Sequence, residues 1–196
     1  YRQIVEGGVG FIAQEATCVT KEGRLSHTQL GIWDDNHIEG LKKIVDVAHK
    51  KNCPIFLQIH HAGLISVAED PMAPSVFTAR NKTSHAMSLP EIEMIQQAFV
   101  EGAKRAVKAG YDGIELHGCH SYLISQFLNR FVNTRTDQYG QDRALFVMEL
   151  FQKIKSEVPA NFLIGIRLGG FEPTLDEAIA YAKRLEAIGL DFLDIS

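Results

Sequence analysis

The sequence predicts an α/β fold built on a parallel sheet, and three features of the pattern support this. Short apolar runs alternate with amphipathic segments along the whole chain. The runs are continuously apolar, which is typical of strands in a parallel sheet covered by helices. Glycines and helix-capping residues separate the segments. A doubly wound sheet and a closed barrel both fit this order, although no Gly-x-Gly-x-x-Gly motif follows a strand, which disfavours a dinucleotide-binding sheet.

Five strands are expected, each at an apolar run. They cover residues 9–13, 54–60, 113–116, 162–168 and 192–195. The first run ends in the polar stretch 14–17, and the fourth carries a single charge, Arg167, near its end.

Helices are expected between the strands, because apolar residues there recur at helical spacing behind capping residues. Asp34 or Asp35 caps the first of them, and Ser88 with Glu91 forms a capping box for the second. The expected helices cover 38–48, 88–110, a segment that opens near Ser121, 143–157 and 173–188.

The charge and cysteine content narrow the class of protein. A net charge of -4 offers no basic surface for nucleic acid or for a membrane. Cys18, Cys53 and Cys119 lie far apart and fit a reducing compartment, with neither a disulfide framework nor a structural metal site. We therefore expect a cytoplasmic protein with a small-molecule substrate. Homo-oligomerisation stays open.

The chain is expected to be a segment of a longer protein, forming one partial domain over residues 1–196. It opens at Tyr1 in what reads as the end of a helix, and it closes at Ser196 directly after an apolar strand. A complete eight-unit barrel needs about 250 residues.

Polar groups gather where the expected strands end. They occupy positions 15–17, 58–61, 117–122 and 167. In a barrel of alternating strands and helices these ends meet at one rim, where active sites are built. In the polar loop 133–141, Arg135 and Asp137 are expected to form a salt bridge.

Three of these stretches resemble signatures of the Old Yellow Enzyme family. They are FLQIHHAG at 56–63, ELHGCHSYL at 115–123 and NTRTDQYG at 133–140. EAT at 15–17, GIW at 31–33 and APS at 73–75 match further family segments in the same order. The resemblance implies a TIM (β/α)8 barrel, here a partial one that lacks the first strand and the last strands. It also implies an FMN-dependent ene-reductase.

The resemblance assigns three residues to the cofactor. Ala16 would lie against the flavin ring, and Gln58 would hydrogen-bond its pyrimidine edge, since an amide offers a donor and an acceptor side by side. Arg167 would place a positive charge near N1 and the C2 carbonyl, where it favours the anionic reduced flavin.

The resemblance also implies roles in substrate binding, hydride transfer and protonation. His117 and His120 would bind the carbonyl oxygen of an α,β-unsaturated substrate. NADH or NADPH would reduce the flavin, whose N5 passes hydride to the β-carbon. Tyr122 would then protonate the α-carbon.

Some positions depart from the family and one alternative remains. Leu64 stands where relatives often have arginine, and the strands that hold the FMN phosphate are absent from this chain. His60 is expected to be structural.

The alternative function is a metal-dependent barrel hydrolase or lyase, with His60, His117 and His120 as ligands. A non-catalytic interaction module is a third reading.

Overall fold

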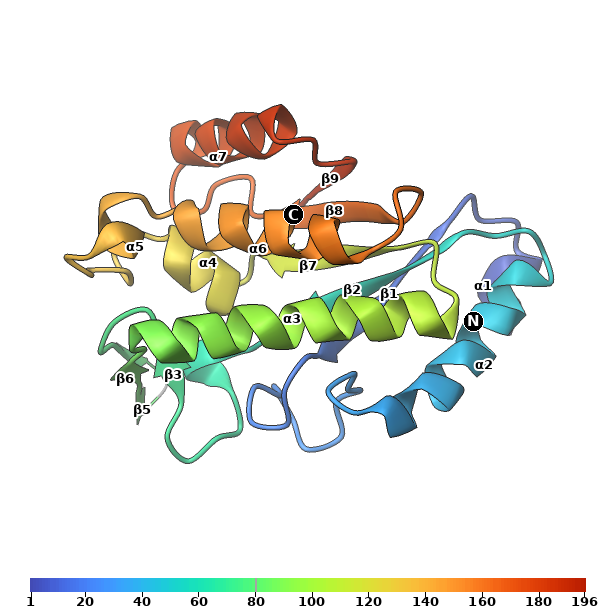
Figure 1. Cartoon of the computed structure of the whole chain (residues 1–196), viewed down its shortest axis with the longest axis horizontal. Helices are drawn as coiled ribbons and strands as arrows, with labels where there is room; N and C mark the ends of the chain where they lie inside the picture. The colour runs from blue at the N-terminus through green and yellow to red at the C-terminus, as the bar shows by residue number, and fades with distance from the viewer. Residues whose placement is uncertain (80) are drawn as a thin grey trace.

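The computed structural model describes residues 1–79 and 81–196. Its centre is a five-stranded sheet in the order β1-β2-β7-β8-β9, and every pair in it is parallel (Figure 1). The strands of this sheet are β1 (Ile12–Cys18), β2 (Ile55–His60), β7 (Gly113–Gly118), β8 (Leu163–Leu168) and β9 (Phe192–Ile195).

Helices connect these strands. They are α1 (Arg2–Glu6), α2 (Ile38–His49), α3 (Leu89–Ala109), α4 (Leu123–Leu128), α5 (Gln138–Gln141), α6 (Leu145–Glu157) and α7 (Leu175–Ala187), with 3-10 turns η1 (Asp35–His37) and η2 (Gly63–Ile65). The expected capping box of Ser88 and Glu91 is present, and Asp34 caps the turn that precedes α2. α3 ends at Ala109 and is capped by Gly110, whose φ of 91° is a conformation that glycine adopts readily.

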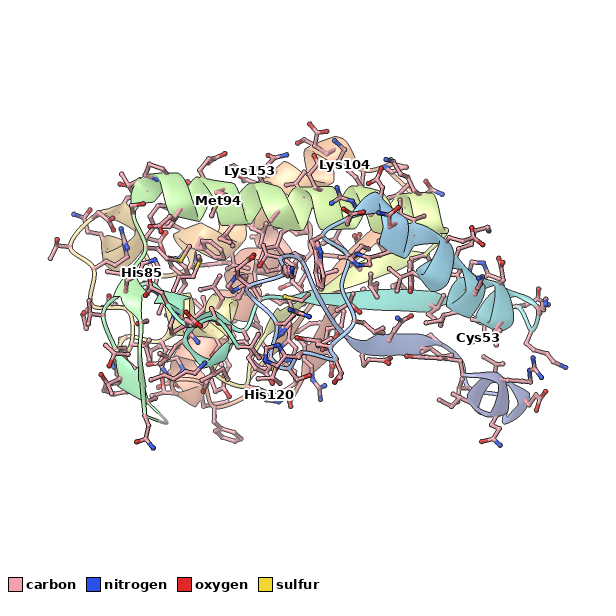
Figure 2. The ribbon with its side chains drawn as sticks, turned by 90° about the horizontal axis from the view of Figure 1, so that it is seen from below. Cys53, His85, Met94, Lys104, His120 and Lys153 are labelled. Atoms are coloured by element: carbon pink, nitrogen blue, oxygen red, sulfur yellow. The ribbon has the colours of Figure 1, made fainter. Side chains whose placement is uncertain are left out.

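Strand order decides between the two folds that the sequence left open. The strands follow one another in chain order, so right-handed crossovers place their helices on the same face of the sheet. α3 packs side by side with α6 and also against α2 (Figure 1). Figure 2 shows Met94, Lys104 and Lys153 on this helical side of the molecule and His120 on the other. The arrangement is part of a barrel wall.

The two faces of the wall carry different residues, because successive strand residues point to opposite sides. Ile55, Leu57 and Ile59 of β2 belong to the hydrophobic core under the helices. Phe56, by contrast, belongs with the inner face: its ring packs against that of Phe192 in β9, at 5.0 Å between centroids. A hollow of about 580 Å³ lies over this face.

The structure corrects three expected boundaries. β1 runs over Ile12–Cys18 rather than 9–13, because it pairs with β2 from Ile12 onwards and its polar residues lie within the strand. β7 extends to Gly118, two residues beyond the expected end. α4 begins at Leu123 rather than near Ser121, since Ser121 has a φ of 61° and cannot start a helix.

The long connection after β2 contains short strands in addition to the five that were expected. β3 (Met72–Ala73) pairs with β6 (His85–Ala86) in parallel, and β4 (Thr78–Ala79) pairs with β5 (Lys82–Thr83) in antiparallel orientation. These ladders shape the connection next to the sheet.

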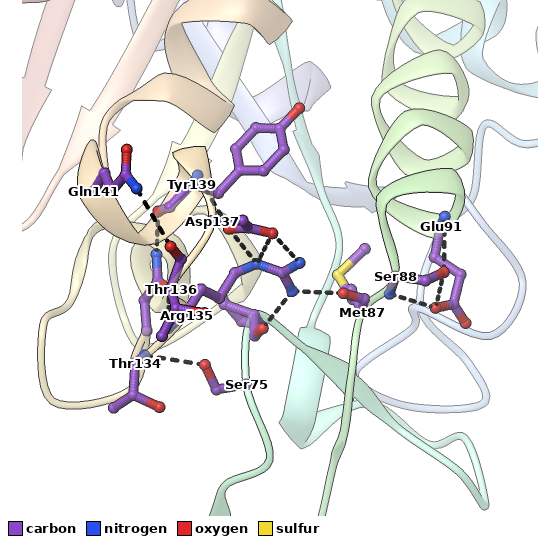
Figure 3. Close-up of polar contacts among 12 residues, drawn as sticks. Ser75, Met87, Ser88, Glu91, Thr134, Arg135, Thr136, Asp137, Tyr139 and Gln141 are labelled. Carbon is purple, nitrogen blue, oxygen red and sulfur yellow. Dashed lines mark hydrogen bonds and ion pairs between the residues drawn. The ribbon is translucent and has the colours of Figure 1, made fainter.

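Arg135 ties this connection to the loop before α5 (Figure 3). Its guanidinium forms the expected salt bridge with Asp137, at 2.5 Å. It also donates to the backbone carbonyls of Pro74, at 2.7 Å, and Met87, at 2.5 Å. One half-buried cation therefore holds three chain segments together.

Candidate active site

The rim at the carboxyl ends of β2 and β7 brings three aromatic side chains together. The rings of His117 and Tyr122 meet edge to face at 4.7 Å between centroids, and His117 lies 5.2 Å from His120. His117 is buried within β7, His120 is exposed, and Tyr122 is half-buried at the start of α4. The two imidazoles and the phenol that the sequence singled out thus share one site.

His60 belongs to the same cluster, although it was expected to be structural. Its ring lies 4.6 Å from that of Tyr122 and 5.6 Å from that of His117. Among the residues that the structure describes, neither of its ring nitrogens has a hydrogen-bond partner, and the side chain is fully buried. His61 is also buried, but its Nδ1 accepts a hydrogen bond from the backbone N–H of Gly63 at 3.0 Å.

Burial keeps the imidazoles of His60, His61 and His117 neutral. Desolvation lowers the pKa of His60 to about 2, with smaller contributions from His117 and His61. Desolvation also lowers the pKa of His117 to about 3, assisted by His120 and Arg167. The pKa of His61 falls to about 4 for the same reason. A neutral imidazole still donates one N–H, so His117 can donate to a substrate oxygen without carrying a charge.

Below this cluster, the inner face carries a buried polar layer. Gln58 of β2 and Glu115 of β7 are partners in the sheet register, and the Gln58 amide nitrogen donates to the Glu115 carboxylate. Burial raises the pKa of Glu115, and the hydrogen bond from Gln58 lowers it. Because the amide donates to Glu115, its oxygen is turned to accept from another group.

Arg167 lies in the same region. β8 places it opposite His117 and β9 places Asp194 beside it, with 3.1 Å between Arg167 Nε and Asp194 Oδ2. The positive charge of Arg167 contributes to the lowered pKa of His117, and it partly offsets the rise that burial causes in the pKa of Glu115. The guanidinium is therefore close enough to act on the polar layer and on the histidine cluster alike.

Ala16 sits at an irregularity in β1. The register between β1 and β2 shifts between Gln14 and Thr17, so one extra residue is accommodated there. Bulges of this kind re-aim side chains and are frequent beside active sites. The Ala16 carbonyl accepts a hydrogen bond from the Gln29 side chain at 2.9 Å, which holds the loop after β1 against the bulge.

Two residues at this site were not expected from the sequence. Glu115 could have been noticed, because it is a carboxylate inside an apolar strand and buried charges need partners. Glu172 could not have been noticed, because it lies in the loop after β8, far along the chain from its partners. Its carboxylate accepts hydrogen bonds from the backbone N–H of His120 and from the hydroxyl of Ser125.

The alternative function uses His60, His117 and His120 as metal ligands, but the group of possible ligand atoms in the structure is a different one. Within the described part of the chain, His117, Cys119 and His120 have ligand atoms within 4.8 Å of one another, and His60 is outside this group. Cys119 is buried, and desolvation raises the pKa of its thiol to about 12. All three cysteines are free.

None of the described helices is long and apolar enough to cross a membrane.

Comparison with known proteins gives consistent relatives. The chain is 38% identical over 199 residues to an NADPH dehydrogenase of Geobacillus thermodenitrificans, covering 97% of this chain and 58% of the relative. It is 38% identical over 206 residues to an NADPH dehydrogenase of Halalkalibacterium halodurans, covering 100% of this chain and 60% of the relative. The chain thus spans about three-fifths of the length of these relatives.

Solved structures agree. Morphinone reductase in complex with tetrahydroNAD superposes with a TM-score of 0.90 at 30% identity, over 99% of this chain and 63% of that one. A 2-naphthoyl-CoA reductase complex superposes with a TM-score of 0.92 at 26% identity, over 100% of this chain and 34% of that one. The partial TIM barrel expected from the sequence is confirmed. The model of the NADH:flavin oxidoreductase / NADH oxidase family matches residues 1–194, and the chain belongs to this FMN-dependent family, the Old Yellow Enzyme family.

Proposed function

We propose that the protein is an NAD(P)H-dependent FMN oxidoreductase that reduces the double bond of an α,β-unsaturated carbonyl compound. The observation that carries the proposal is the rim cluster, in which His117 lies within ring contact of both His120 and Tyr122. Family membership supports the cofactor. The names of the relatives favour NADPH as the reductant.

The residues of the inner face fit the polar edge of a flavin ring. That edge needs both hydrogen-bond donors and acceptors, and Gln58 and Arg167 supply them. Gln58 is held by Glu115, and Arg167 is held by Asp194, so both would meet the ring in defined orientations. Ala16 at the bulge of β1 would pack against the ring. FMN, when bound, supplies the hydride.

The rim cluster would bind and polarise the substrate. His117 is neutral at physiological pH and would donate an N–H to the carbonyl oxygen, together with His120. Two donors stabilise the negative charge that develops on this oxygen as the β-carbon accepts hydride. The Tyr122 hydroxyl would deliver a proton to the α-carbon, a role that suits a phenol because it keeps its proton at neutral pH.

The test separates the two half-reactions in the full-length protein. Tyr122→Phe should slow reduction of an α,β-unsaturated ketone by on the order of 10²-fold or more, because positioned general acids contribute about that much. Reduction of the FMN by NADPH should stay near the wild-type rate. Tyr181→Phe is the matched control, since its hydroxyl donates to the Leu128 carbonyl away from the cluster. Equal slowing of both half-reactions would remove Tyr122 as the proton donor.

A colour test addresses the cofactor itself. The full-length protein purified without added cofactor should be yellow and should bleach on reduction. Colourless protein that retains a divalent metal would favour the metal-dependent alternative.

A further inference from the structure

The turn that presents His120 is strained. His120 and Ser121 have φ values of 59° and 61°, and neither is glycine. For such residues the left-handed conformation is unfavourable, and it persists where surrounding contacts impose it. The contacts that hold this turn therefore decide where the His120 ring lies.

Glu172 makes those contacts from a different part of the chain. It lies after β8, and its Oε1 accepts a hydrogen bond from the backbone N–H of His120 at 3.3 Å. Its Oε2 accepts a second one from the hydroxyl of Ser125 at 2.9 Å. Ser125 is buried in α4, so the carboxylate joins the strained turn to the helix that follows it.

Gly169 provides the space for this side chain. A Cβ at Gly169 would lie 2.6 Å from the Glu172 Cδ and Cγ atoms, well inside contact distance. The His120 ring is held separately, since its Nε2 lies 2.7 Å from the Ser196 hydroxyl. Residues that follow β8 and β9 thus fix both the backbone and the ring of His120.

We propose that Glu172 is a positioning residue, which holds His120 in the orientation needed to bind the substrate oxygen together with His117. This inference rests on the proposed function of the histidine pair. Glu172 acts through the backbone and not on the ring itself: its two carboxylate oxygens accept hydrogen bonds from the backbone N–H of His120 and from the hydroxyl of Ser125.

The test is binding of phenol to the full-length, FMN-loaded protein, followed by the change in flavin absorbance. A phenol oxygen resembles the carbonyl oxygen as it acquires negative charge, so it reports on the histidine pair. Glu172→Ala should weaken phenol binding about tenfold, which corresponds to the loss of about one charge-assisted hydrogen bond. Glu172→Gln keeps an acceptor for the His120 N–H and should stay within about threefold of wild type.

A double-mutant cycle distinguishes positioning from general damage. In a His120→Ala background, Glu172→Ala should cause no further loss of phenol affinity, because there is no ring left to position. Glu177→Ala is the matched control: this carboxylate lies five residues further on and pairs with Arg130 and Thr174 instead. It should leave phenol binding unchanged. If Glu172→Ala fails to fold, Gly169→Ala displaces the same carboxylate and should reproduce the loss.

Two contrary results have different meanings. Wild-type affinity in Glu172→Ala, or a loss that adds fully to that of His120→Ala, would overturn the positioning role alone. A wild-type protein that binds FMN but no phenol would overturn the oxygen-binding role of the histidine pair, and this inference with it.

Discussion

His60 should make the protein sensitive to acid, and its replacement should remove a defined part of that sensitivity. The pKa values of His60, His61 and His117 lie at about 2, 4 and 3 in the folded protein, against an ordinary value of 6.5. Between about pH 4 and 6.5 the unfolded chain therefore binds protons at these positions and the folded chain does not. Stability must fall as the pH falls through this window, and above it these groups contribute no pH dependence.

The magnitude follows from one proton per histidine. One pKa unit corresponds to 1.36 kcal/mol, so lowering the pH from 6.5 to 5 costs about 2 kcal/mol for each of the three, or about 6 kcal/mol together. This is comparable with the whole stability of many domains. His85 opposes the trend, because its hydrogen bond to Asp70 raises its pKa, but it is partly exposed and its share is smaller.

The free energy of unfolding should depend less steeply on pH in His60→Leu, because one fewer proton is taken up on unfolding. Below pH 6 the slope should fall by about 1.4 kcal/mol per pH unit. At pH 7.5 the change should be close to neutral, because the buried ring nitrogens have no hydrogen-bond partner among the described residues. Urea unfolding of the full-length protein at pH 7.5, 6.5, 5.5 and 5 would measure both quantities.

His60→Gln serves as the control for packing. It should show the same reduced slope as His60→Leu even if its stability at pH 7.5 differs, because the slope depends on the number of protons and not on side-chain volume. An unchanged slope in both variants would mean that His60 is charged in the folded protein, and would refute the reasoning.

The remaining predictions concern packing and the polar layer. Arg135→Met should lower the free energy of unfolding by about 3 kcal/mol, measured in urea, because the carbonyls of Pro74 and Met87 and the carboxylate of Asp137 lose their partner. A change below about 0.5 kcal/mol would contradict the role of the contacts drawn in Figure 3. Gly165→Ala should lower the melting temperature by several degrees, since its Cβ would lie 2.2 Å from the Phe192 ring; a wild-type melting temperature would count against this packing. Glu115→Gln should raise the midpoint potential of bound FMN, because a negative charge beside Gln58 is lost; an unchanged potential would show that the carboxyl is not ionised there.

Much of the fold could be predicted because its signals are local. Strand β2 and helix α3 follow from a continuous apolar run and from a capping box, and both were placed within a residue or two. β1 was misplaced because Gln14 and Thr17 are polar and buried, and their burial depends on partners from elsewhere in the chain. The Tyr111 hydroxyl, for example, donates to Gln14 at 2.6 Å.

In the candidate site, too, local features could be predicted from the sequence and long-range contacts could not. His117, His120 and Tyr122 could be found because they lie within six residues and match a family signature. The left-handed turn at His120 and Ser121 and its contact with Glu172 could not be found, because the contact joins residues 52 positions apart in the chain. The place of His60 in the cluster could not be predicted for a related reason: nothing local shows that its ring meets Tyr122.

The central claim is that Gln58 and Arg167, from separate strands, bind the polar edge of the same FMN ring. The most direct measurement is the FMN dissociation constant of the full-length apoprotein, obtained from quenching of flavin fluorescence. Gln58→Leu and Arg167→Leu should each weaken binding by about tenfold or more, as expected for hydrogen bonds to a buried ring. Wild-type affinity in both variants would contradict the account, because the ring would then lie elsewhere.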